Sequence, residues 1–342
     1  MEIILFICFL VAFLTTYLLT PLWIRAVKKA GLIGKDLNKF DRPEVADFGG
    51  ITVVAGFMAG VLTYIGLTTF YFHFDPLDTY LFLILAGITT VLSITVVGML
   101  DDVLGWKTGL KQWQKPLLTI PAALPMMAVN AGHSTMAVPF FGTINFGILY
   151  PLVIIPLGIA GASNGFNMLA GFNGLEAGLG ALILGFLGFV AWQTGNSWVT
   201  MLSVSMLSAL LAFLLYNWHP AKIFPGDTLT YSVGALIATV AILGNMEKIA
   251  MILFSLYFIE FLIKAKTKFK GECFGKPMED GTLSIPRKKV VLSHLILALG
   301  CTQYLSRPVD KIQKLSSPSI TPFLPLWQTH GQVWKVREVY VL

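Results

Sequence analysis

Acidic and amide side chains gather in three short stretches of an otherwise apolar sequence. These stretches are residues 98–104 with Asp101 and Asp102, residues 164–176 with Asn164, Asn167, Asn173 and Glu176, and residues 224–228 with Asp227. Carboxylate and amide oxygens are hard ligands suited to Mg²⁺, which takes one or two protein carboxylates together with water and substrate phosphates. Lysines nearby can offset phosphate charge, which is the main need in phosphoryl transfer. The residue types therefore indicate a diphosphate substrate.

The composition indicates a lipid environment for the chain. Hydrophobic residues make up 56% of the 342 residues and charged residues only 12%, whereas a soluble domain carries about 25% charged residues. A soluble fold of this composition would expose large apolar patches, which soluble monomers avoid. The cysteines at 8, 273 and 301 are far apart, so neither a disulfide framework nor a metal-binding spacing is indicated.

Apolar segments long enough to cross a bilayer recur along the chain. A crossing needs about 20 mostly apolar residues, and a helix satisfies its own backbone in lipid. We therefore expect an all-α, polytopic helical membrane protein with nine to ten transmembrane helices in a domain of residues 1–300. Residues 301–342 are polar and proline-rich, which predicts a tail with little order. The expected spans are 2–24, 49–71, 80–100, 116–130, 146–163, 174–194, 198–216, 229–245 and 248–264, with a short tenth stretch at 290–300.

The basic residues separate the two faces of the membrane. The loops after the first, third, fifth, seventh and ninth spans hold 18 of the 24 lysines and arginines. Positive charge concentrates on the cytoplasmic side, so these loops are expected to be cytoplasmic and the N-terminus outside. All three polar stretches fall on the same side. Because the basic excess follows topology, a nucleic-acid partner is not expected.

Each polar stretch also has a purely structural explanation. Asp101 and Asp102 can mark the point where a span meets water. Asn173 with Glu176 fits a helix capping box, and Asp227 can cap the helix that it precedes. None of these explanations accounts for why all three stretches fall on the same face, so the functional interpretation is favoured.

The same stretches resemble the polyprenyl-phosphate N-acetylhexosamine-1-phosphate transferase family, especially its eukaryotic and archaeal branch that makes dolichyl-linked GlcNAc. The matching segments are 34–39 (GKDLNK), 101–104 (DDVL), 164–178 (NGFNMLAGFNGLEAG) and 216–228 (YNWHP running into FPGDT). The resemblance implies transfer of GlcNAc-1-phosphate from UDP-GlcNAc to a polyprenyl or dolichyl phosphate in the bilayer, with release of UMP. It also implies a need for Mg²⁺, with Mn²⁺ as an alternative, and leaves a homodimer open.

The resemblance further assigns roles to individual positions. It places Mg²⁺ on Asn167 and Asp227, the lipid phosphate beside Asp101 and Asp102, and the diphosphate against Lys115. Gly171, Asn173 and Phe224 match the family's uracil-binding positions, with Leu37 nearby, and Glu44 would line the rim. Asn164 is a further substrate-binding position. Arg287 would serve the diphosphate from a last cytoplasmic loop where many relatives carry a histidine motif.

Three rival interpretations remain open. A transporter would also cluster charge within its spans, although here the charges lie toward one face. The family chemistry could act on another sugar, such as UDP-MurNAc-pentapeptide; by resemblance, the NGLEAG stretch favours GlcNAc. An inactive relative is the third, because the tail after residue 300 does not resemble the family's final span.

Overall fold

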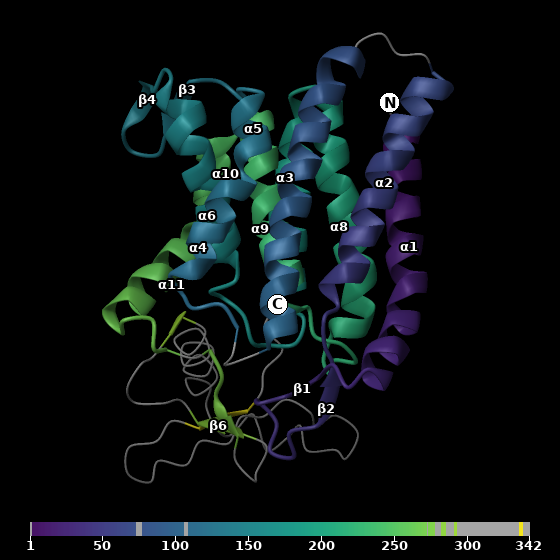
Figure 1. The fold of residues 1–342 in the computed structure, drawn as a ribbon, viewed down its shortest axis with the longest axis vertical. Helices are drawn as coiled ribbons and strands as arrows, with labels where there is room; N and C mark the ends of the chain where they lie inside the picture. Colours follow the sequence, from purple (N-terminus) through teal and green to yellow (C-terminus); the bar gives the residue numbers. More distant parts are fainter. Residues whose placement is uncertain are drawn as a thin grey trace, which may run out of the picture.

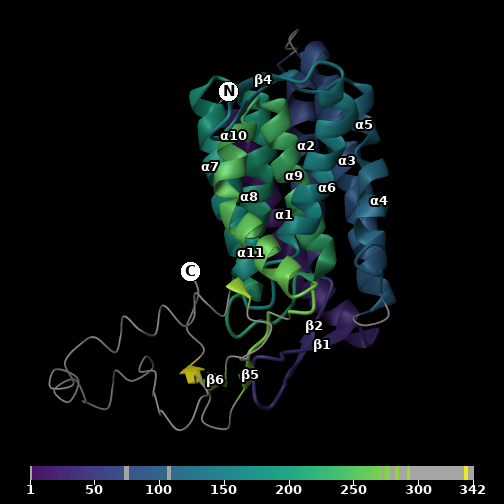
Figure 2. The ribbon, with the colours of Figure 1, turned by 90° about the vertical axis from the view of Figure 1, so that its left-hand side faces the viewer.

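The helices of the chain run side by side in one bundle, with short β-hairpins at its two ends (Figures 1 and 2). The computed structural model describes residues 2–72, 77–105, 109–271, 273–277, 282–284, 291–292 and 335–337. The expected helical membrane fold is confirmed in its main features. Arg287, nearly all of the tenth apolar stretch and most of the predicted tail lie outside the described residues.

Six helices are long and apolar enough to cross a membrane. Each coincides with one of the predicted spans, and their apolar side chains face outward as well as inward. On α1, the outward residues recur every fourth position, as in Phe6, Leu10 and Leu14, which places them on one face of the helix. An apolar exterior is what lipid requires. The six are α1 (Glu2–Lys29), α2 (Gly50–Phe70), α3 (Leu77–Leu104), α7 (Leu175–Gln193), α8 (Ser197–Asn217) and α9 (Gly226–Leu243).

The other three predicted spans fall on helices that are interrupted. Prolines lie at the first two breaks, between α4 (Gln114–Ala122) and α5 (Leu124–Ala128) and within the run of η1 (Tyr150–Ile154) and α6 (Ile155–Phe166). Proline removes a backbone donor and bends a helix. The third break, at Phe254, separates α10 (Glu247–Leu253) from α11 (Ser255–Lys266), which leans away from the bundle in Figure 1.

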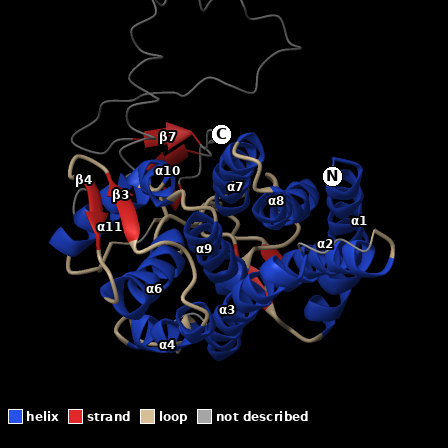
Figure 3. Ribbon diagram, turned by 90° about the horizontal axis from the view of Figure 1, so that it is seen from above, coloured by secondary structure: helices blue, strands red, loops and turns tan. Residues whose placement is uncertain are grey.

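Helix α9 forms the centre of the bundle, as the view along the helices shows (Figure 3). It is the most enclosed of the six long helices, and it packs against α3 and α6 above all. Gly98 of α3 allows this close approach, because a Cβ there would come within 2.7 Å of the Asp227 carbonyl oxygen. The N-terminal end of α9 carries Asp227, so the packing of the core fixes the position of that carboxylate.

Short antiparallel strands add a small β component that the all-α expectation omitted. At the end of the bundle where α3 ends and α9 begins, β1 (Ile33–Lys35) pairs with β2 (Glu44–Ala46), and β6 (Thr282–Ser284) lies between β5 (Lys276–Pro277) and β7 (Lys335–Arg337). At the opposite end, β3 (Thr135–Val138) pairs with β4 (Gly142–Asn145). These strands are too short and polar to have shown the alternation by which strands are recognised in a sequence.

Candidate active site

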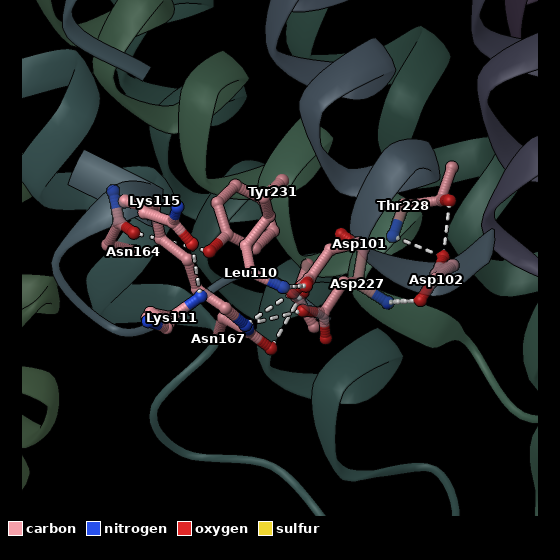
Figure 4. A network of polar contacts seen from close by, with 12 residues as sticks. Asp101, Asp102, Leu110, Lys111, Lys115, Asn164, Asn167, Asp227, Thr228 and Tyr231 are labelled. Atoms are coloured by element: carbon pink, nitrogen blue, oxygen red, sulfur yellow. Dashed lines mark hydrogen bonds and ion pairs between the residues drawn. The ribbon is translucent and has the colours of Figure 1, made fainter. Parts of the chain in front are cut away.

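The polar stretches predicted from the sequence meet at one end of the bundle (Figure 4). Three elements converge there: the C-terminal turn of α3, the N-terminal turn of α4 and the N-terminal turn of α9. Each supplies a charged side chain, namely Asp101, Lys115 and Asp227. Because these helices are fixed by their packing in the bundle, the charged groups are held in place before any substrate arrives.

The Lys115 ammonium bridges the carboxylates of Asp101 and Asp227. It forms an ion pair with Asp101 and another with Asp227 Oδ2, at 3.0 Å. It also lies 5.9 Å from the centre of the Tyr231 ring, within range of a cation–π contact. Asp101 is further fixed by the Leu110 N–H, which donates to its Oδ1 at 2.7 Å. The cluster is therefore a single positive group placed between two negative ones.

Asp102, the neighbour of Asp101, points to α9 and caps it. Its Oδ1 accepts the Asp227 N–H at 2.6 Å, and its Oδ2 accepts the N–H of Thr228 at 2.9 Å and the hydroxyl of Thr228 at 2.5 Å. These N–H groups have no partner within their own helix. Gly226 has a φ of +69°, and a Cβ there would meet Asp102 at 2.7 Å. Asp102 thus positions the helix end that carries Asp227.

Replacing Asp102 with Ala should destabilise the protein because it leaves these donors buried without an acceptor. We expect a loss of about 2 kcal/mol, the usual scale for a lost cap and charged hydrogen bonds. Thermal unfolding in detergent would show it as a lower midpoint for Asp102→Ala than for Asp101→Ala. Equal midpoints for the two variants would contradict the capping role.

Two amides lie beside the charged cluster. Asn167 Oδ1 accepts the Thr230 hydroxyl at 3.0 Å, and Thr230 lies within one turn of Asp227 on α9. Asn164 Oδ1 accepts the Tyr231 hydroxyl at 3.2 Å, while its Nδ2 donates to the Thr119 hydroxyl at 2.9 Å. Asn167 is therefore tied to the same helix turn as Asp227, and Asn164 links α6 to α4 and α9.

The donor set suits a hard divalent cation. Two carboxylates, Asp101 and Asp227, already converge on one cation, the Lys115 ammonium, and an amide oxygen of Asn167 lies on the adjacent turn. Among the residues that the structure describes, no group of three or more His, Cys, Asp or Glu side chains is arranged to hold a metal. A metal here would therefore depend on water and substrate phosphates as well, which is the usual mode for Mg²⁺.

The loop from Asn167 to Gly174 carries two of the predicted uracil-binding positions. Gly171 has a φ of +113°, a region that favours glycine, and its N–H donates to Glu176 Oε1 at 2.8 Å. Asn173 Nδ2 donates to Asp36 Oδ2 at 3.3 Å. The capping-box alternative is wrong, because Gly174 is the N-cap of α7 and Glu176 reaches back to Gly171 instead.

The strands β1 and β2 bring further predicted positions to this end. The Phe224 N–H donates to the Ala46 carbonyl at 2.8 Å, and a Cβ at Gly34 would lie 3.1 Å from the Phe224 ring. Phe224 therefore lies against the hairpin that carries Leu37 and Glu44. Leu37 is half-buried in the turn, whereas Glu44 is exposed on β2. The structure gives neither of them a direct contact with the charged cluster among the described residues.

Two titratable groups in the loops near this end are shifted by burial. Burial raises the pKa of Asp47, against the hydrogen bond that its carboxylate accepts from the Phe48 N–H. Burial also lowers the pKa of His219, and the Lys39 ammonium lowers it further. The Nδ1 of His219 lies 3.5 Å from Asn173 Nδ2.

The sequence did not single out every residue of this arrangement. Thr230 and Tyr231 lie in the first turns of α9 and bind Asn167 and Asn164. Both follow the FPGDT stretch, three and four positions after Asp227, which is the spacing of neighbours on one helix face. That spacing is the sequence signal by which they could have been found. Asn38 binds two segments at once; it lies within the matching stretch 34–39, but no role was assigned to it there.

The chain is similar to proteins of known families over most of its length. Residues 81–245 match the model of glycosyl transferase family 4. A Saccharolobus solfataricus protein, named as a candidate UDP-N-acetylglucosamine–dolichyl-phosphate N-acetylglucosaminephosphotransferase, is 38% identical over 85% of this chain and 87% of its own. A Sulfolobus acidocaldarius protein with the same name is 36% identical over the same shares. A phospho-N-acetylmuramoyl-pentapeptide-transferase from Halalkalibacterium halodurans is 30% identical over 77% of this chain and 82% of its own.

Proposed function

The chain belongs to glycosyl transferase family 4, among the polyprenyl-phosphate N-acetylhexosamine-1-phosphate transferases, and from this premise we propose its substrates and mechanism. It transfers GlcNAc-1-phosphate from UDP-GlcNAc to a polyprenyl phosphate of the dolichyl type and releases UMP. The Lys115 ammonium between Asp101 and Asp227 carries the proposal. A cation held by two carboxylates at the end of a membrane bundle suits a diphosphate whose acceptor remains in lipid.

The reaction is a displacement at the β-phosphorus of UDP-GlcNAc. A phosphate oxygen of the polyprenyl phosphate forms the new P–O bond, and the bond from the β-phosphorus to the bridging oxygen breaks, so that UMP leaves with that oxygen. An ionised phosphate oxygen needs little activation, which favours direct attack over a covalent enzyme intermediate. Lys115 offsets charge on the diphosphate, and Asp101 orients the Lys115 ammonium.

The predicted metal site would add to the charge that Lys115 supplies in this reaction. When bound, Mg²⁺ would be held by Asp227 and Asn167 and would supply further positive charge to the diphosphate. Mn²⁺ takes similar oxygen ligands. Asp102 keeps the first turn of α9 in place for this purpose, through its bonds to the N–H groups of Asp227 and Thr228.

The uracil is assigned to the loop that follows α6. Gly171 and Asn173 lie on this loop, and Phe224 and Leu37 lie toward the β1–β2 hairpin. Asn164, which is hydrogen-bonded to Thr119 and Tyr231, is assigned to the sugar-phosphate part of the substrate. Glu44 is assigned to the rim because its side chain is exposed. The prediction for Arg287 falls outside the described residues.

The site is proposed to face the cytoplasm. The interrupted helices α4–α5, η1–α6 and α10–α11 are proposed to add three crossings to the six long helices, with the N-terminus outside. Lysines collect at the site end, for example Lys28, Lys111 and Lys266, while Lys248 lies at the other end near β3. Positive residues favour the cytoplasmic face, where UDP-GlcNAc is available.

The transporter alternative gains no support from the helix interiors. In the long helices, the charged side chains that the structure describes lie near the helix ends, as Arg25, Asp101 and Asp227 do. A substrate pathway through a transporter has its ionisable residues near the midplane. The transferase interpretation is thus preferred, and residues 1–300 are proposed to form its one domain.

Product analysis tests the proposed substrates. The purified protein, given UDP-GlcNAc, a dolichyl phosphate and Mg²⁺, should form a lipid whose mass equals dolichyl phosphate plus GlcNAc-phosphate. UDP-MurNAc-pentapeptide, supplied in parallel, should give less than about a hundredth of that product, which is the discrimination that unpaired polar groups can supply. A larger product yield from the pentapeptide substrate would reverse the assignment of the sugar.

A further inference from the structure

The segment that follows α11 is bound to the loop that carries Gly171 by contacts from two sides. On one side is Asn38, a buried residue in the turn after β1. Its Nδ2 donates to the Gly171 carbonyl at 2.6 Å, and its Oδ1 accepts the Gly275 N–H at 3.1 Å. One side chain thus joins three segments that lie far apart in the sequence.

On the other side lies an ion pair near the end of α11. Glu260 is fully buried and pairs with Lys264 at 3.2 Å, as the i, i+4 spacing predicts. Lys264 Nζ also donates to the Met168 carbonyl at 2.5 Å, which belongs to the same loop as Gly171. Glu260 Oε2 accepts the Leu292 N–H at 2.7 Å. The pair therefore holds the Gly171 loop and the chain beyond α11 at once.

The segment between these two sides covers the loop. Cys273 is only 7% exposed, and its thiol donates to the Met168 carbonyl at 3.4 Å. The Phe274 ring lies against Gly171, where an added Cβ would meet it at 3.1 Å. Burial raises the pKa of the Cys273 thiol, so its reactivity reports whether the segment is docked.

We infer that residues 273–275 form a clamp on the Gly171 loop (residues 167–174). Asn38, Glu260 and Lys264 act as positioning residues for the uridine half of the substrate. The inference rests on the proposed function, because the loop is assigned to uracil. A loop fixed before binding loses less freedom when the ligand arrives. By linkage, bound UDP-GlcNAc must in turn hold the clamp closed.

The test combines a thiol measurement with kinetics on the purified full-length protein. N-ethylmaleimide modification of Cys273 is followed by mass spectrometry of its peptide, which separates it from Cys8 and Cys301. Asn38→Ala should raise the labelling rate about tenfold and the KM for UDP-GlcNAc about tenfold, as expected for two lost buried hydrogen bonds. The KM for polyprenyl phosphate should not change. Asn196→Ala, at the opposite end of the bundle, is the matched control.

A second variant guards against a general folding defect of Asn38→Ala. Glu260→Gln with Lys264→Met removes both charges of the pair together and should produce the same two changes. Faster labelling with an unchanged KM, a raised KM with unchanged labelling, or no change in either would each overturn the clamp. UDP-GlcNAc alone should slow labelling of the wild-type protein. Because that measurement needs no turnover, it separates a failed clamp from a failed transferase assignment.

Discussion

Replacing Asp227 with Asn should lower the turnover number by about 100-fold or more, which is the scale of losing one preorganised charge at a phosphoryl-transfer site. The amide keeps the shape of the side chain, and the backbone N–H that binds Asp102 is untouched. What is lost is the negative charge that faces Lys115 at 3.0 Å and is proposed to face the metal. Turnover is measured as UMP released from UDP-GlcNAc at saturating lipid and Mg²⁺.

Asp41→Asn is a suitable control, because Asp41 is an exposed carboxylate in the turn after β1 at the same end of the bundle. It should retain turnover close to that of the wild-type protein. A raised requirement for Mg²⁺ in Asp227→Asn would add support from an independent direction. Full activity of Asp227→Asn at ordinary Mg²⁺ concentrations would remove Asp227 from the metal site.

Replacing Lys115 with Met should lower kcat/KM for UDP-GlcNAc by about 100-fold, since the ammonium is the one cation between Asp101 and Asp227 among the described residues. Met keeps most of the apolar stem and removes the ammonium, which lies 5.9 Å from the centre of the Tyr231 ring. Without the ammonium, the two carboxylates repel each other and the incoming diphosphate. Steady-state rates at varied UDP-GlcNAc would show the loss.

The matched control is Lys111→Met, because Lys111 is exposed on the approach to α4 and forms no ion pair with either carboxylate. It should leave kcat/KM within about twofold of the wild-type value, as usual for a surface charge. If Lys115→Met altered only the amount of membrane-inserted protein and not its kinetics, the lysine would serve topology alone.

The helices and the convergence of charge could be predicted because lipid imposes simple rules on a sequence. Apolar length located α2 and α7 to within two residues, and the order of the predicted spans placed Asp101 and Asp227 on one face. The separate roles of the adjacent carboxylates could not be predicted. Asp101 binds Lys115 whereas Asp102 caps α9, and this difference depends on how α3 packs against a helix 125 residues further on.

In the loops, too, the sequence indicated the functional residues but not their contacts. The stretch 164–178 indicated a substrate site through its composition, but the contacts that hold it come from Asn38 and Lys264, which are distant in sequence. The Asn173 and Glu176 pair matched a local capping pattern, yet Glu176 binds Gly171 because tertiary packing favours that partner. Local patterns therefore identified the residues more reliably than their partners.

The most direct test of the proposed transferase is UMP release by the purified protein from UDP-GlcNAc, with and without polyprenyl phosphate, and with EDTA as a control. The Lys115 cluster predicts release that requires both the lipid and the divalent metal. Release of UMP without lipid, or release that EDTA leaves unchanged, would contradict the proposed mechanism. No release from protein that is folded and binds UDP-GlcNAc would indicate a relative without transferase activity.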